Sequence, residues 1–449
     1  MRPGMKLSRF GALFCILIGL AVQAYAGVTV LLEEPYSYDG ALAGIGHTAI
    51  YLPHVCAATP VSLRRCKPGE RGVVISRYNR IAGYDWIAIP LIPYLYAVDN
   101  PEDVPLAANQ KLVALLRDQY RRAHLEKLAP DTASGNAPKG DWVQLIGSAY
   151  DRTSYGFQIE TTPQQDDALI QWFNSRPNHA SYKVISSNCA DFVREVVDFY
   201  YPKALSRAGV TDLGIATPEH AAKSLIHYSK HHRDLKFTRI VFPQVPGTMK
   251  RSRPVRGLLE SVVRAKKYIL PLAVFHPIVA GSVASAYLLG DRFNPARNAM
   301  VFNPNGRPGP PPSDDERQTY RKDLQAEKES SGKRNGEGDR AMWRKFLQEA
   351  QFQLDGSGRP VMEASYGDDL IEMGVTREDF PSNNAPATLQ RGLLLARLRQ
   401  ALSRSRAPEM SGEELRDDWQ LLQEIDSTAQ ENVSISREAG NQENERIPN

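Results

Sequence analysis

Short apolar runs in the first half of the chain predict strands, and longer stretches with helical periodicity follow them. Strands are expected at Val28–Glu33, Gly46–Leu52, Arg71–Tyr78 and Trp86–Ile89, where β-branched and aromatic residues lie between Gly, Pro or Asp. Helices are expected at Asn109–Lys127, Pro163–Phe173, Cys189–Tyr201 and Pro218–His227. Because strands come before most of the helices, the pattern indicates one α+β domain over residues 27–230.

A second apolar region, Tyr268–Gly290, has 23 residues without Asp, Glu, Lys or Arg. At about 1.5 Å per residue, a helix of this length spans about 34 Å, enough to cross a bilayer. Pro271 and Pro277 interrupt it, and the basic cluster in residues 249–267 lies on the unfavoured side for one crossing by an exported protein. A span, a membrane hairpin and a buried helical pair all stay open, and contact with the membrane is the prediction.

The remaining chain divides into polar linkers and helices. Residues 231–267 are predicted to be a basic linker, and residues 291–340, rich in Pro, Gly, Ser and charge, a disordered one. Residues 341–449 are predicted to be helical and partly disordered, with amphipathic helices at Ala341–Leu354, Thr388–Leu402 and Glu413–Ile425. Arginines around the leucines of the second helix suit a membrane surface or a helical protein partner, although a solvated face of a bundle is the commoner reason for such a pattern.

The first 26 residues have the pattern of a signal peptide. Three basic residues are followed by an apolar run from Phe10 to Val22, and Ala24-Tyr25-Ala26 forms a small-residue cleavage site. The run is short for a membrane span, which disfavours an uncleaved signal anchor. The mature protein is therefore expected to be exported, to the periplasm or another extracytoplasmic location.

Removal of the signal leaves an odd number of cysteines, namely Cys56, Cys66 and Cys189. Disulfides persist in an exported protein, and Cys56 and Cys66 close a short loop, so they are the natural pair. Cys189 is then the free thiol; the alternative is that all three are reduced and buried. The spacing of Cys56 and Cys66 is not Cys-x-x-Cys, which disfavours a disulfide exchange protein.

Charge and motif content exclude several function classes. The net charge of +4 does not indicate nucleic-acid binding. The sequence has neither a zinc-type cysteine spacing nor a glycine-rich phosphate loop, so it predicts no metal and no cofactor.

Cys189 lies in Asn188-Cys189-Ala190-Asp191, at the predicted start of a helix. Asn188 is the expected N-cap, which places the sulfur in the first turn. The helix dipole and the free backbone N–H groups there favour a thiolate, as in many nucleophilic cysteines. The alternative is an inert core cysteine, because free cysteine is among the most buried residue types.

His47 lies in Gly44-Ile45-Gly46-His47-Thr48-Ala49-Ile50-Tyr51-Leu52, on a predicted strand. The two-residue period places its ring on the same face as Ala49 and Tyr51. A strand that packs against the start of the Cys189 helix brings such a histidine within reach of the thiol as a general base. Alone, a histidine on a strand is more often a packing residue.

Three segments together resemble the circularly permuted papain-like hydrolases. They are the GHTAIY strand, the later NCADFV helix, and the helix start Thr217-Pro218-Glu219. That superfamily includes NlpC-type peptidases and lecithin retinol acyltransferase-like proteins, and in its permuted branch the histidine precedes the cysteine. The resemblance covers about residues 28–230 and implies a central antiparallel sheet with packed helices, followed here by the apolar segment and the helical C-terminal region.

The resemblance implies a Cys–His dyad in which His47 deprotonates Cys189 and the thiolate attacks a carbonyl. Backbone N–H groups at the helix start would hold the oxyanion. The family's third residue orients the imidazole and usually comes from a later strand; Ser76, Asn79, Asp85 and His54 are the candidates, and none is favoured.

The predicted function is an exported, membrane-associated cysteine hydrolase or acyltransferase that acts on an amide or ester of the cell envelope, in a peptidoglycan peptide or a lipid. The alternative is a non-catalytic envelope protein that binds a partner on a papain-like scaffold. Thiol reactivity well below pH 8.5 would separate the two.

Overall fold

A computed structural model of the chain gives a mixed α/β structure. It describes residues 27–36, 45–78, 81–179, 182–183, 186–207, 215–256, 271, 273–278, 280–281, 293–332, 336–380, 385–403 and 406–444. The expected signal peptide, residues 1–26, lies outside the described residues, as does most of the apolar segment 268–290.

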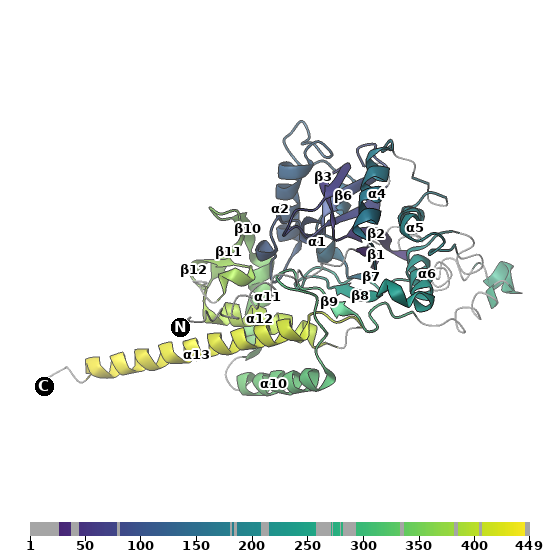
Figure 1. The fold of residues 1–449 in the computed structure, drawn as a ribbon. Helices are drawn as coiled ribbons and strands as arrows, with labels where there is room; N and C mark the ends of the chain where they lie inside the picture. The colour runs from purple at the N-terminus through teal and green to yellow at the C-terminus, as the bar shows by residue number, and fades with distance from the viewer. Residues whose placement is uncertain are drawn as a thin grey trace, which may run out of the picture.

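A seven-stranded sheet forms the centre of the fold, in the order β6-β5-β2-β1-β7-β8-β9 (Figure 1). Every neighbouring pair is antiparallel except β8 and β9, which are parallel. The strands are β1 Gly27–Glu33, β2 His47–Leu52, β5 Val73–Arg77, β6 Trp86–Pro90, β7 Ser154–Glu160, β8 Thr238–Phe242 and β9 Met300–Val301. The mixed α/β content agrees with the expected α+β class, but the sheet, expected to be antiparallel, is mixed because β8 and β9 are parallel.

The four predicted strands are confirmed within two residues at each end. The sequence pattern missed β7, β8 and β9, and also the separate hairpin of β3 Val55–Thr59 and β4 Ser62–Arg65. Since β8 and β9 complete the main sheet, that sheet continues past the expected domain boundary at residue 230.

Helices cover both faces of the sheet. They include α1 Leu91–Tyr96, α2 Gln110–Tyr120 with a π-helical turn at Arg121–Leu125, α3 Ser148–Asp151, α4 Pro163–Asn174, α5 Cys189–Tyr200 and α6 Pro218–His231. Short 3₁₀ turns lie at Pro101–Asp103, Asp141–Leu145 and Arg233–Leu235. The expected caps are present: Thr162 caps α4, Asn188 caps α5 and Thr217 caps α6.

The alternation of side chains along β2 separates two hydrophobic cores. Ile50 and Leu52 belong to the core that includes Phe192 and Val193 of α5. Ala49 belongs to the other core, which includes α1 and α2 and continues into the C-terminal region. Helix α5 therefore covers one face of the sheet and α1 the other.

The C-terminal region packs on the sheet domain and is more regular than its sequence indicates. Its elements are α10 Asp314–Gly332, α11 Gly336–Glu349, β10 Gln351–Leu354, β11 Pro360–Tyr366, β12 Asp369–Gly374, a 3₁₀ turn at Arg377–Asp379, α12 Ala387–Ala401 and α13 Gly412–Asn444. Helix α10 lies within the expected disordered linker, and the three-stranded sheet β10-β11-β12 was not expected. Helix α13 projects away from the rest of the fold (Figure 1).

Arg397 of α12 joins the C-terminal region to the sheet domain. Its guanidinium is buried, pairs with Glu414 at 3.0 Å and Asp418 at 2.9 Å, and donates to the Leu106 carbonyl at 2.7 Å. Such a buried charge is stable only with these partners, so the contact ties α12 and α13 to the segment before α2.

Within the residues that the structure describes, no helix is long and apolar enough to cross a membrane. The described part of Tyr268–Gly290 contains short helical pieces with Val274 and Phe275 about three-quarters exposed, at 73% and 75%. The disposition of the whole segment falls outside the described residues.

Candidate functional site

The first turn of α5 is fixed by its cap. The Asn188 side chain accepts from the backbone N–H of Ala190 at 2.8 Å and of Asp191 at 3.0 Å, and the Asp191 carboxylate accepts from the Asn188 N–H at 3.3 Å. This reciprocal pattern is a capping box. It leaves Cys189 as the first residue of the helix, as predicted.

The Cys189 thiol is free and buried, as expected from the cysteine count. Its sulfur lies within hydrogen-bonding reach of the backbone N–H groups of Thr48, Ala190 and Cys189 itself. Burial nevertheless raises the pKa of Cys189 to about 11, because loss of water penalises the thiolate more than these N–H groups stabilise it. The expected thiolate is therefore not the resting form; the sequence showed the helix start but not the depth of burial.

The His47 ring contacts two residues from the neighbouring strand, Ser76 in β5 and Tyr78 directly after it. Its Nε2 lies 2.7 Å from the Ser76 hydroxyl, and the ring stacks on Tyr78 with centroids 5.2 Å apart. Burial lowers the pKa of His47 to about 4, and the nearby Glu33 carboxylate offsets part of this effect. The imidazole is thus neutral at pH 7.

Ser76 is the member of the four third-residue candidates that contacts His47. It also donates to the Thr48 carbonyl at 3.1 Å, so its single hydroxyl hydrogen is used there and it accepts from Nε2–H of His47. That tautomer leaves the lone pair on Nδ1. Asp85 instead pairs with Arg77 at 2.7 Å, His54 lies beside the disulfide loop, and Asn79 is outside the described residues.

Helix α5, which begins at Cys189, and strand β2, which begins at His47, approach each other at Thr48. The pairing of β2 with β5 begins at Ile50, so the main-chain groups of Thr48 are not part of that ladder. Its carbonyl accepts from Ser76 and its N–H faces the Cys189 sulfur. The backbone N–H of the residue after His47 thus lies near the thiol and lowers its pKa.

The ring and the helix approach this point from different sides. His47 and Tyr78 lie on the sheet face that α1 covers, whereas α5 packs on the opposite face. Among the described residues, no hydrogen bond joins the His47 ring to the Cys189 sulfur. Hydrogen bonds of catalytic residues often form fully only with substrate bound, and the Cys189–His47 dyad stays a prediction.

A buried ion pair next to His47 was missed by the sequence analysis. Glu33 lies directly opposite His47 in the β1–β2 register and is fully buried. Its carboxylate pairs with Arg152 at 3.0 Å and accepts a short hydrogen bond from the Tyr94 hydroxyl. The available signal was an acid at the end of an otherwise apolar strand, because such a residue needs a partner when buried.

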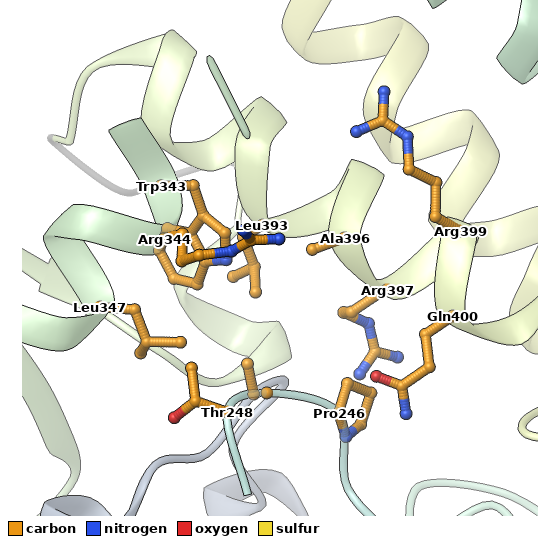
Figure 2. A pocket seen from close by; sticks show the side chains of 12 residues that line it. Pro246, Thr248, Trp343, Arg344, Leu347, Leu393, Ala396, Arg397, Arg399 and Gln400 are labelled. Atoms are coloured by element: carbon orange, nitrogen blue, oxygen red, sulfur yellow. The ribbon is translucent and has the colours of Figure 1, made fainter. Parts of the chain in front are cut away.

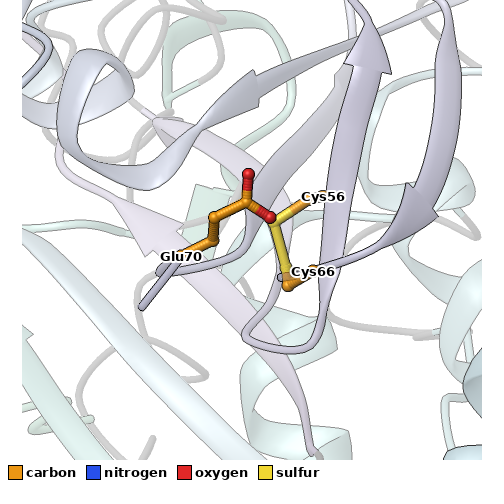
Figure 3. A group of neighbouring side chains, drawn as sticks. All are labelled: Cys56, Cys66 and Glu70. Carbon is orange, nitrogen blue, oxygen red and sulfur yellow. A yellow bond between two sulfur atoms is a disulfide. The ribbon is translucent and has the colours of Figure 1, made fainter. Parts of the chain in front are cut away.

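The predicted disulfide between Cys56 and Cys66 is present, in the β3–β4 hairpin (Figure 3). Glu70 lies beside it, and the three side chains are close enough together to resemble a metal site. Disulfide sulfurs are not thiolates, however, and Glu70 pairs with Arg64 at 2.6 Å. This group therefore serves the structure of the hairpin.

A cavity of about 290 Å³ lies between the Pro246–Thr248 loop and helices α11 and α12 (Figure 2). Arg344, Arg397 and Arg399 line it, but the charge of Arg397 is balanced by Glu414 and Asp418. Neither Cys189 nor His47 borders this cavity.

Comparison with known proteins found no family model that matches the chain, no similar protein of curated function and no similar solved structure.

Proposed function

We propose that the protein is a cysteine-dependent hydrolase or acyltransferase, with Cys189 as the nucleophile and His47 as the general base. The observation that carries this proposal is the contact at Thr48. The thiol at the start of α5 meets the backbone next to His47, whose ring Ser76 holds with Nδ1 available. A free thiol, an oriented imidazole and a backbone N–H at a helix start are the parts that acyl transfer needs.

The first half of the reaction forms an acyl-enzyme. The Cys189 proton passes to Nδ1 of His47, and the electron pair left on sulfur attacks the substrate carbonyl carbon. The oxyanion accepts a hydrogen bond from the backbone N–H of Cys189 at the start of α5. The tetrahedral intermediate then collapses, and the leaving amine or alcohol takes the proton from the His47 imidazolium.

The second half releases the acyl group. Water, or the hydroxyl or amine of an acceptor, attacks the thioester while His47 takes its proton, and that proton returns to the departing sulfur. Water as acceptor gives a hydrolase, and another acceptor gives an acyltransferase. Both keep the enzyme unchanged over one cycle.

As part of the same proposal, the sheet domain has a permuted papain-like fold. It is supported by the order of the histidine strand and the cysteine helix, by the antiparallel pairing of β2 with β1 and β5, and by a polar residue on β5 that holds the imidazole. We propose an envelope peptide or lipid as the substrate and an exported, membrane-associated location. The disulfide supports an oxidising compartment, and the exposed Val274 and Phe275 support lipid contact.

A non-catalytic binding function is the second candidate. Two observations favour it: the thiol and the imidazole are both neutral at pH 7, and α5 and the His47 ring occupy opposite faces of the sheet. In that case Cys189, His47 and Ser76 are packing residues of the core, and the partner binds at another surface.

An acyl-enzyme trap separates the two candidates. The full-length protein is incubated with p-nitrophenyl butyrate, and nitrophenol release and intact mass are followed together. We expect a burst of nitrophenol and a butyryl adduct on Cys189. Both should be absent in Cys189→Ala, and His47→Asn should slow the reaction by on the order of 10²–10⁴-fold.

His124→Asn is the matched control, because His124 is an exposed histidine on the π-helical turn that pairs with Asp99 at 3.0 Å, remote from the site in sequence. It should react as the wild type does. Hydrolysis that persists unchanged in Cys189→Ala, or the absence of any adduct on Cys189, would reject the proposed mechanism.

A further inference from the structure

Glu33 places a buried carboxylate beside the proposed general base. The antiparallel register sets Glu33 directly opposite His47, on the same sheet face, and Cβ atoms of such pairs lie about 5 Å apart. The Glu33 side chain is fully buried, so no water screens its charge from the imidazole.

Two groups from other elements fix this carboxylate. Arg152, just before β7, forms an ion pair with it at 3.0 Å, and Tyr94 of α1 donates its hydroxyl hydrogen to the other oxygen. Arg152 is itself held over the Tyr36 ring, 5.0 Å from its centroid. Glu33 therefore cannot turn away from His47 without breaking its contacts to Arg152 and Tyr94.

The proposed reaction needs an imidazolium in a place where burial disfavours it. Burial lowers the pKa of His47 to about 4, so the proton that leaves Cys189 enters an unfavourable site. A fixed negative charge nearby reduces that cost at the moment when the imidazolium forms. Arg152 acts in the opposite direction, and its effect on His47 is smaller than that of Glu33.

We propose that Glu33 is a positioning residue of this site, whose carboxylate, held by Arg152 and Tyr94, stabilises the His47 imidazolium formed when Cys189 gives up its proton. The catalytic role of Glu33 rests on the proposed function of Cys189 and His47. The electrostatic coupling itself is a property of the folded protein and does not depend on turnover.

Several groups that titrate or carry charge face His47 from the packed elements. They are Glu33 from β1, Arg152 before β7 and Tyr78 after β5; Tyr94 of α1 contacts Glu33, and Cys189 of α5 lies near the backbone of Thr48. Burial raises the pKa values of Tyr78, Tyr94 and Cys189, so these three stay neutral between pH 3 and 7. Within that range, the coupling to His47 comes from Glu33 and Arg152.

The test is a titration of the His47 ring in the full-length protein, with histidine labelled with ¹³C and the His47 signal identified by its loss in His47→Asn. The midpoint is compared in the wild type, Glu33→Gln, Arg152→Met and Arg152→Lys. Glu33→Gln keeps an acceptor for Tyr94 but removes the charge, and Arg152→Lys keeps the charge.

The two charge-removing variants should move the midpoint in opposite directions. Arg152→Met should raise it by on the order of one pH unit, because the carboxylate then acts without its partner. Glu33→Gln should lower it below the wild-type value, so that no His47 titration is seen at pH values where the wild type already titrates. Arg152→Lys should restore the wild-type midpoint.

A disturbed fold would shift both variants in the same direction, and that result, or midpoints that do not move, would overturn the role of Glu33. If Glu33→Gln does not fold, the comparison of Arg152→Met with Arg152→Lys decides alone. A midpoint that rises only in the Met variant supports the proposal, and one that is unchanged or lower overturns it.

The failure of this inference is distinct from failure of the proposed function. If Cys189→Ala hydrolyses the ester as the wild type does, the dyad is rejected, yet the titration still tests the coupling between Glu33 and His47. If the dyad holds, Glu33→Gln should lower kcat with little change in KM, since Glu33 acts through His47 and touches no substrate.

Discussion

At the scale of single residues, burial decides the chemistry of the candidate site. Cys189 has the helix-start position that usually yields a thiolate, but the sheet and helices around it exclude water, and the thiol stays protonated. His47 is kept neutral by the same exclusion of water. An enzyme with this resting pair gains its nucleophile only when proton transfer and substrate binding occur together.

The pH dependence of alkylation measures this directly. With the pKa of Cys189 at about 11, the rate of reaction with iodoacetamide at Cys189 should be low at pH 7 and still increase between pH 9 and 10.5. Mass spectrometry of the Cys189 peptide gives the rate, and glutathione, whose thiol is solvated, is the reference. A rate that levels off below pH 8.5 would show a thiolate and contradict the protonated resting state.

The same shift affects stability, with a sign that follows from proton binding. The pKa of Cys189 is higher in the folded protein than in the unfolded chain, where it is about 9. The contribution of this thiol to the free energy of unfolding is therefore complete below pH 9 and is lost as the pH rises towards 11. The pKa of His47 is lower in the folded protein than its ordinary value of 6.5. The contribution of this imidazole to the free energy of unfolding is therefore complete above about pH 6.5 and is lost as the pH falls towards 4. These two groups therefore favour the folded state most between these limits.

At the scale of elements, the start of α5 depends on one side chain for both its stability and its chemistry. Asn188 accepts from two backbone N–H groups and donates to the Ala216 carbonyl, which links α5 to the segment before α6. Arg77 of β5 adds a second link, because it donates to Ser187 and lies over the Phe192 ring. The orientation of the first turn, and with it the direction of the sulfur, follows from these contacts.

Removal of the cap should change the two properties together. Asn188→Ala is expected to lower the free energy of unfolding by about 1 kcal/mol, the usual cost of an N-cap, and to alter the alkylation rate at Cys189. Thr162→Ala removes the equivalent capping box of α4, and it is the matched control.

Urea denaturation and alkylation of both variants provide the measurement. The control should lose similar stability without a change at Cys189. Equal alkylation rates in the two variants would show that the cap of α5 does not position the sulfur.

At the scale of the whole molecule, the C-terminal region is part of the structure around the sheet. One hydrophobic core runs from α1 and α2 into α11, α12 and α13, and the buried Arg397 connects them. In the described part of Tyr268–Gly290, Val274 and Phe275 are exceptions, since both are exposed. Exposed apolar side chains that follow a basic segment are typical of contact with an anionic lipid surface.

Lipid contact predicts a loss of vesicle binding on substitution of these two residues. The full-length protein should sediment with phosphatidylglycerol vesicles at low salt, and Val274→Asp with Phe275→Asp should reduce the bound fraction severalfold, because two charges enter the apolar interface. Leu370→Asp is the control, at a site on β12 that is also exposed, to 68%. Binding that is unchanged in the double variant, or lost equally in the control, would contradict contact through this segment.

The sequence determined the local features of the site by itself. A capping Asn before Cys189, an alternating strand around His47 and a short loop between Cys56 and Cys66 depend on neighbours along the chain, and the structure has all three. Local sequence patterns also predicted the strands β1, β2, β5 and β6 and the helices α4, α5 and α6. It failed for β7 and β8, whose strand character depends on pairing with distant partners in the sheet.

Only the tertiary structure decided which residues surround Cys189 and His47 and how they are charged. Ser76 was one of four candidates until the pairing of β5 with β2 brought it to the His47 ring, and Glu33 became part of the site because the register of β1 places it opposite. Burial, which sets the protonation of Cys189 and His47, comes from elements on both faces of the sheet. A linear pattern shows which residues are able to react, but their pKa values depend on how much water the whole fold excludes.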